Sequence, residues 1–241
     1  MRAKLFVVAL LALGASAWAQ TTQTKPKVTI DQSTPQKALA TYLAACNALD
    51  FNSIKATITG GDATKLSNIA HPLIIYHMWQ LRVERQAIEK FGEENGITVF
   101  GHLRSLDKQF ALDEKRLRDA LLDYKNDQRT RAVVFMKREK DRPENLQVDK
   151  FRFRDDFTLV KSGDKWFVDY FATYELDNPE KESETLWLGT VHNKMAAELK
   201  KISEQLKGNV FKTADDVKLA VEAAEKAAYD EGTPKEAPAQ K

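Results

Sequence analysis

The chain has 241 residues, of which 43% are hydrophobic and 30% are charged, a composition typical of a globular protein with a sizeable core. Its 37 lysine and arginine residues nearly balance 35 aspartate and glutamate residues. Nucleic-acid-binding proteins normally carry clustered positive charge, so this balance argues against nucleic acid as a partner.

The first nineteen residues have the pattern of a secretory signal peptide. Arg2 and Lys4 precede a short apolar run over residues 5–13, and Ala17 and Ala19 stand at the −3 and −1 positions of a cut after residue 19. The run is shorter than the roughly 20 residues that a membrane span needs, and no second run of that length follows. We therefore expect an exported protein, periplasmic or secreted, without a membrane span.

Cys46 is the only cysteine, so an intramolecular disulfide is excluded even in an oxidising compartment. It lies on the apolar face of a predicted helix. That position favours a buried, inert thiol over a reactive or dimer-forming one. The fold must therefore be stabilised by packing.

The first structural elements are predicted after a polar stretch without periodicity, residues 20–32, which suits a linker. Thr34 can cap a helix whose first residue is Pro35 and whose apolar positions are regularly spaced. A second, short helix is predicted over residues 51–58, ended by Gly60 and Gly61. This glycine pair lacks the spacing of a phosphate-binding loop.

Three further elements are predicted before the sequence changes its periodicity. A helix over residues 72–91 carries an apolar stripe and ends at Gly92. Residues 97–100 are predicted as a short strand. Residues 106–124 are predicted as a helix with a charged, solvated face.

Apolar residues then recur at every second position, which predicts the strands of a sheet. Strands are expected over residues 131–137, 148–160 and 166–171, with a tight turn at residues 162–164 between the last two. One face of the long strand is aromatic and apolar, comprising Phe151, Phe153, Phe157 and Leu159.

Helical spacing returns over residues 188–206, with apolar residues at Leu188, Val191, Met195, Leu199, Ile202 and Leu206. A further helix is predicted to start at Thr213, and the two could close as a hairpin. We predict a linker at residues 20–32, an α+β domain over 33–176, a helical extension over 177–230 and a disordered tail over 231–241.

Two segments resemble the nuclear transport factor two-like superfamily. The first contains Thr34-Pro35, Ala38-Leu39, Tyr42-Leu43 and residues 48–51, and the second covers residues 157–169. The resemblance, which extends over residues 34–60 and 130–172, implies a cone. In this fold a curved antiparallel sheet wraps around amino-terminal helices and often encloses an apolar pocket. The superfamily contains enzymes, ligand binders and interaction modules, so the resemblance leaves the function open.

Tyr42 is the first candidate catalytic residue. It stands eight residues before Asp50, which resembles the placement of the tyrosine that holds an oxyanion in ketosteroid isomerase, an enzyme of this fold. The aspartate base of that enzyme has no counterpart in residues 62–67. A core tyrosine with a satisfied hydroxyl is therefore the favoured interpretation.

Asp155 is the second candidate. In a regular strand it would lie between Phe153 and Phe157, where an apolar environment would raise its pKa and suit a general acid. Asp155 and Asp156 would instead face water in a β-bulge, which is the favoured alternative. His71 and His77 fall on different helix faces, and we predict neither a metal site nor a cofactor.

Two functions remain open. The favoured one is a non-catalytic binding or interaction protein that holds a small apolar ligand in the cone or a protein partner. The predicted pocket residues are Tyr42, Phe153, Phe157 and Trp166, and the surface for a partner or for a homo-oligomer is the helix over residues 188–206. The alternative is a small-molecule isomerase, dehydratase or cyclase that transfers protons through Tyr42 and Asp155.

Overall fold

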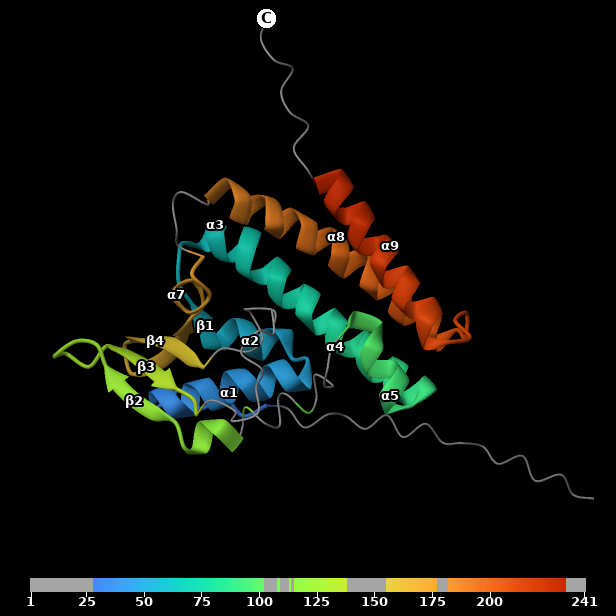
Figure 1. Cartoon of the computed structure of the whole chain (residues 1–241). Helices are drawn as coiled ribbons and strands as arrows, with labels where there is room; N and C mark the ends of the chain where they lie inside the picture. Colours follow the sequence, from blue (N-terminus) through green and yellow to red (C-terminus); the bar gives the residue numbers. More distant parts are fainter. Residues whose placement is uncertain are drawn as a thin grey trace, which may run out of the picture.

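The computed structural model describes residues 28–101, 108, 113, 115–137, 155–176 and 182–232. In this part of the chain the protein is an α+β structure with one five-stranded sheet, as the α+β class predicted from the sequence requires. Figure 1 shows the strands beside α1 and α2, with α4, α8 and α9 gathered on the other side of these two helices.

The first two helices begin where the sequence predicts, and the second ends one residue early because Ile58 belongs to a strand. Helix α1 spans Pro35–Ala48, and its cap Thr34 accepts a hydrogen bond from the Lys37 N–H. Leu49 has a φ of 57°, a left-handed conformation that ends the helix. Helix α2 spans Phe51–Thr57, and the Asp50 carboxylate accepts from the Ser53 N–H at its start.

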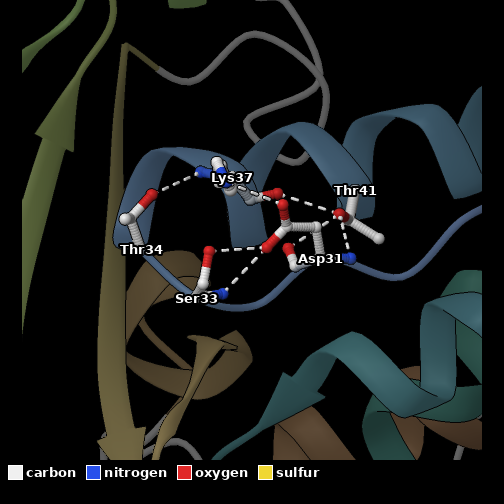
Figure 2. Close-up of polar contacts among 5 residues, drawn as sticks. All are labelled: Asp31, Ser33, Thr34, Lys37 and Thr41. Carbon is white, nitrogen blue, oxygen red and sulfur yellow. Dashed lines mark hydrogen bonds and ion pairs between the residues drawn. The ribbon is translucent and has the colours of Figure 1, made fainter.

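Asp31 fastens the segment before α1 to that helix (Figure 2). Its carboxylate accepts from the Ser33 hydroxyl at 2.7 Å and pairs with the Lys37 ammonium at 2.9 Å. Its backbone N–H donates to the Thr41 hydroxyl oxygen at 3.2 Å. The hydrogen bonds from Ser33 and Lys37 lower the pKa of Asp31 from its usual 3.8 to about 2.

The end of the predicted linker is also packed. Gln32 is buried, its carbonyl accepts from the Trp166 N–H at 2.9 Å, and its side-chain amide donates to the Trp166 carbonyl at 2.8 Å. Val28 contacts the main hydrophobic cluster. Residues 28–32 therefore belong to the folded domain.

The strands of the sheet are β1 (Ile58–Thr59), β2 (Leu121–Tyr124), β3 (Arg131–Phe135), β4 (Asp156–Ser162) and β5 (Lys165–Asp169). Their order across the sheet is β1-β5-β4-β3-β2. The sheet is mixed, and not wholly antiparallel as predicted, because β1 runs parallel to β5 while the other neighbours are antiparallel. Gly163, with a φ of 58°, forms the predicted tight turn between β4 and β5.

Two elements have a different type from the one predicted. Ile97–Phe100 is a 3-10 helix, η2, and not a strand, because Val99 is buried in a cluster with α9 and not against a neighbouring strand. Leu121–Tyr124 is strand β2 and not the end of a helix, because it pairs with β3. The spacing of residues in the sequence does not predict that residues 121–124 pair with β3.

The three other predicted strands have different limits. Strand β3 ends at Phe135, two residues before the predicted end. The last strand ends at Asp169, whose carboxylate caps helix α7 (Tyr170–Tyr174) by accepting from the Ala172 N–H at 3.1 Å. Strand β4 begins at Asp156, and residues 148–154 of the predicted long strand lie outside the described residues.

The remaining helices are α3 (Ala63–Lys65), the π-helix η1 (Leu66–Ala70), α4 (His71–Phe91), α5 (Glu93–Gly96), α8 (Glu182–Lys207) and α9 (Ala214–Gly232). Helix α4 is shared by two hydrophobic clusters. Leu73 and Ile74 near its start belong to the main cluster, with α1, α2, α7 and the sheet. Val83 and Ala87 belong to a second cluster with α8 and α9. The carboxy-terminal helices therefore pack on α4.

Candidate functional site

Tyr42 lies on the face of α1 that packs against the sheet, where it is 5% exposed. Its hydroxyl is 3.2 Å from the hydroxyl of Tyr174 on α7, and the ring of Tyr174 lies 4.5 Å from that of Tyr170. Burial raises the pKa of Tyr42 well above its ordinary value, and Cys46 and the other two tyrosines add to this effect. Tyr42 is therefore a protonated core tyrosine whose hydroxyl has a partner.

Cys46 follows Tyr42 by one helical turn. Burial raises the pKa of its thiol to about 12, and a hydrogen bond with Tyr42 opposes that shift only in part. The thiolate, which is the reactive form, is scarce at neutral pH when the pKa is so high. The raised pKa agrees with the inert thiol that the sequence favours, although Cys46 is partly and not fully buried.

The predicted pocket residues come together, but in the core. Phe157 of β4 and Trp166 of β5 belong to the same buried cluster as Tyr42. The rings of Tyr42 and Phe157 lie 6.4 Å apart and are tilted by 60°. All three side chains are at most 5% exposed within their own chain. The fourth residue of the predicted pocket, Phe153, lies outside the described residues.

Asp155 precedes β4 and continues the register of the β3–β4 pair, since its carbonyl accepts from the Met136 N–H at 2.6 Å. No residue is inserted at this position, so Asp155 and Asp156 do not form the predicted bulge. The side chain of Asp155 therefore lies on the same face of the strand as Phe157, as the alternation of a regular strand indicates. The surroundings are not apolar, because the side chain of Asp155 is 39% exposed and pairs with Arg116.

Arg116 pairs with two carboxylates, and sequence reasoning did not identify it as a candidate site residue. Its guanidinium is nearly buried and contacts Asp155, the Asp113 carboxylate at 2.8 Å and the Lys137 carbonyl at 2.6 Å. The sequence predicts that the charged residues of this segment lie on a solvated helix face. The only indication of this role in the sequence is the spacing of Asp113 and Arg116, which are three residues apart and so lie side by side on a helix. The arrangement ties the segment before β2 to the ends of β3 and β4.

The apolar stripe of α8 is covered within the chain. Its buried positions are Val191, Met195, Leu199, Ile202 and Leu206. They pack against α4 and α9 in the second and third hydrophobic clusters. The surface predicted to bind a partner or a second copy is therefore internal packing.

Exposed apolar side chains gather instead on β2 and β3. Leu121 is 74% exposed and stands opposite Phe135, which is 39% exposed, on the face of the sheet that points away from α1. Tyr124 of the same strand is 38% exposed. The predicted helix over residues 106–124 is wrong at its end, residues 121–124, and this error hid the surface from sequence reasoning.

Comparisons with known proteins gave no match: no family model, no curated protein and no solved structure is similar to this chain. Among the described residues, no helix has the length and hydropathy needed to cross a membrane. Within the same residues, no group of three or more histidine, cysteine, aspartate or glutamate side chains is placed to hold a metal ion.

Proposed function

We propose that the protein is an exported, non-catalytic interaction protein that uses its outer surface to bind a protein partner. In this proposal residues 1–19 direct export, the sheet and the amino-terminal helices form a nuclear transport factor two-like cone, and α8 and α9 form a helical hairpin on α4. The packing of α1 and α2 against the sheet supports the cone, and the contact between α8 and α9 supports the hairpin.

The observation that carries the proposal is that the candidate catalytic groups are engaged inside the chain. The Tyr42 hydroxyl is held by Tyr174 in the core, and its pKa is raised, so it is a poor acid and is not presented to solvent. Asp155 is paired with Arg116. A proton-transfer site would need both groups to converge on a substrate, and neither is disposed to do so.

The location of the partner surface follows from exposure. Large apolar residues that stand side by side at the surface mark interaction sites in soluble proteins. Leu121 and Phe135 form such a pair on adjacent strands. The favoured partner is therefore a protein that covers β2 and β3, and a small apolar ligand between Tyr42, Phe157 and Trp166 is the less favoured form of binding.

Site-specific photocrosslinking in the native cell envelope tests this proposal. A photoreactive phenylalanine analogue at Leu121 should give a covalent adduct of defined mass. The same analogue at Leu219 is the matched control, because this leucine of α9 is 64% exposed and lies outside the proposed surface. Equal labelling from both positions, or none from Leu121, would contradict the proposal.

Two further readouts separate the alternatives. The intact mass of protein recovered from the exported fraction should correspond to a chain that begins at Gln20, and a mass that retains residues 1–19 would contradict the export step. Native mass spectrometry should show no retained small molecule. A retained molecule that is lost in Tyr42→Phe and Asp155→Asn variants would instead support the isomerase, dehydratase or cyclase alternative.

A further inference from the structure

Strand β2 is the last strand on its side of the sheet in the described part of the chain. The Lys125 N–H just beyond it donates to the Arg131 carbonyl of the β3 side at 2.9 Å. In an antiparallel ladder, hydrogen-bonded residues alternate with residues whose N–H and C=O groups point the other way. The backbone polar groups of Leu122 and Tyr124 therefore point away from β3, toward the open edge.

The pairing of β3 with β4 agrees with this alternation. The Met136 N–H donates to the Asp155 carbonyl, and the Lys161 N–H donates to the Thr130 carbonyl. Even-numbered residues of β3 thus bond β4, which leaves odd-numbered residues to bond β2. The open edge of β2 is then a row of backbone donors and acceptors, a template for pairing with another strand.

The sequence of this edge is complementary to itself when two copies run antiparallel around Leu122. This register places Leu122 opposite Leu122 of the second copy, so that each could donate to and accept from the other. The Tyr124 N–H would reach the Ala120 carbonyl of the second copy. The Ala120 N–H makes no hydrogen bond to the second copy in this register, since it already donates to the Leu117 carbonyl of its own chain.

Side chains match in the same register. Leu121 stands opposite Asp123 of the second copy on the outer face, and the two Leu121 side chains meet diagonally across the axis. Lys125 stands opposite Asp119 of the second copy, which gives one pair of opposite charges on each side of the axis. Asp123 is already paired with Lys125 in its own chain, which offsets the approach of the two Asp123 carboxylates.

We propose that β2 pairs antiparallel with β2 of a second copy of this chain, with the two-fold axis at Leu122, to form one continuous sheet across a homodimer. This inference rests on the proposed function and names its partner. The pairing covers Leu121 and Tyr124, which are otherwise exposed on an open edge. Because β2 is only four residues long, the dimer is weak and depends on these side chains.

Sedimentation equilibrium of the mature protein over a range of concentrations tests the proposal. The wild-type mass should rise from one chain to two with concentration. Leu121→Asp puts a carboxylate opposite Asp123 of the second copy and should weaken dimerisation by about tenfold or more, whereas Leu121→Lys should weaken it less because it meets an opposite charge. Equal effects of the two variants would overturn this register.

A charge exchange separates pairing from folding defects. Lys125→Glu alone should raise the dimer dissociation constant, and adding Asp119→Lys should restore it toward wild type. Lys226→Glu, at an exposed lysine of α9, is the matched control and should leave the dimer unchanged. A protein that stays monomeric at every concentration would overturn the proposal, as would a dimer that none of the β2 variants weakens.

A disulfide fixes the register independently, in a Cys46→Ser background. Chains with Leu121→Cys mixed with chains with Asp123→Cys should form a bridged dimer on oxidation, because directly opposite positions that share no backbone hydrogen bonds bring Cα atoms to about 4.5 Å. Chains with Leu121→Cys alone should form less of the disulfide-bridged dimer.

Photocrosslinking from Leu121 distinguishes the two proposals. An adduct with the mass of two chains supports the homodimer. An adduct with a different protein only would retain the proposed function and overturn the homodimer, and no adduct would contradict both.

Discussion

Gly189 is the point at which α8 crosses the π-helix η1, and replacing it tests how the carboxy-terminal helices dock. A Cβ added at Gly189 would lie 2.1 Å from the Asn68 carbonyl oxygen and 3.2 Å from its carbonyl carbon. Contacts below 3.0 Å are essentially never made by Cβ atoms, and the obstacle is backbone that cannot rotate away. Gly189→Ala therefore requires α8 to move from η1 by about 1 Å.

The expected cost follows from two opposing effects. Overpacking of a close contact costs about 1–3 kcal/mol, and a clash this short belongs at the upper end. Alanine recovers about 1 kcal/mol of helix propensity relative to glycine. The net loss in the free energy of unfolding is then about 2 kcal/mol, which lowers Tm by about 4–8 °C for a chain of this size.

Thermal and urea denaturation of Gly189→Ala measure this effect, with Gly208→Ala as the control. Gly208 follows the last residue of the same helix, and a Cβ there would lie 3.5 Å from the Glu204 carbonyl oxygen, an ordinary contact. The control should match wild type or exceed it slightly. The reasoning is refuted if Gly189→Ala is as stable as the wild type, because α8 would then not approach η1 this closely.

Three further predictions concern charged and reactive side chains. The stability that Asp31 contributes is present above its usual pKa of 3.8 and is lost as the pH falls toward about 2, so the stability gap between wild type and Asp31→Asn should close over that interval; a gap that does not change with pH contradicts this. Cys46 should react far more slowly with a thiol reagent at pH 8 in the native protein than in denaturant, and equal rates would mean that its thiol is not buried. Arg116→Met should cost about 3 kcal/mol because the nearly buried Asp113 carboxylate loses its guanidinium, while Arg118→Met at an exposed position of the same segment should cost little in the same denaturation assay.

Sequence reasoning was accurate where structure is specified by neighbours in the chain. The Thr34 cap with Pro35 after it located the start of α1, and the spacing of apolar residues located α4 and α8. The turn at Gly163 was visible because only a few residue types accept its left-handed backbone. The burial of Tyr42 followed from its place on the apolar face of α1.

The candidate site was less predictable, because it depends on which distant residues meet. Tyr42, Phe157 and Trp166 share one cluster, as the expected pocket requires, yet their own chain buries them. Asp155 lies on the face of a regular strand, although a bulge was the favoured interpretation, and it pairs with Arg116, which no local pattern predicts. Similarly, the stripe of α8 revealed an apolar face without revealing that α4 and α9 cover it.

The sequence by itself determined the α+β class, the main helices and the β4–β5 turn, because periodicity, capping and turn conformation are local properties. Tertiary structure decided the rest. Residues 121–124 became a strand because β3 offers them a partner, and residues 97–100 became a 3-10 helix because Val99 packs on helices. Among the described residues, β2 is an edge strand only because of the order of the strands, since pairing between distant segments, and not residue type, determines which backbone groups remain open.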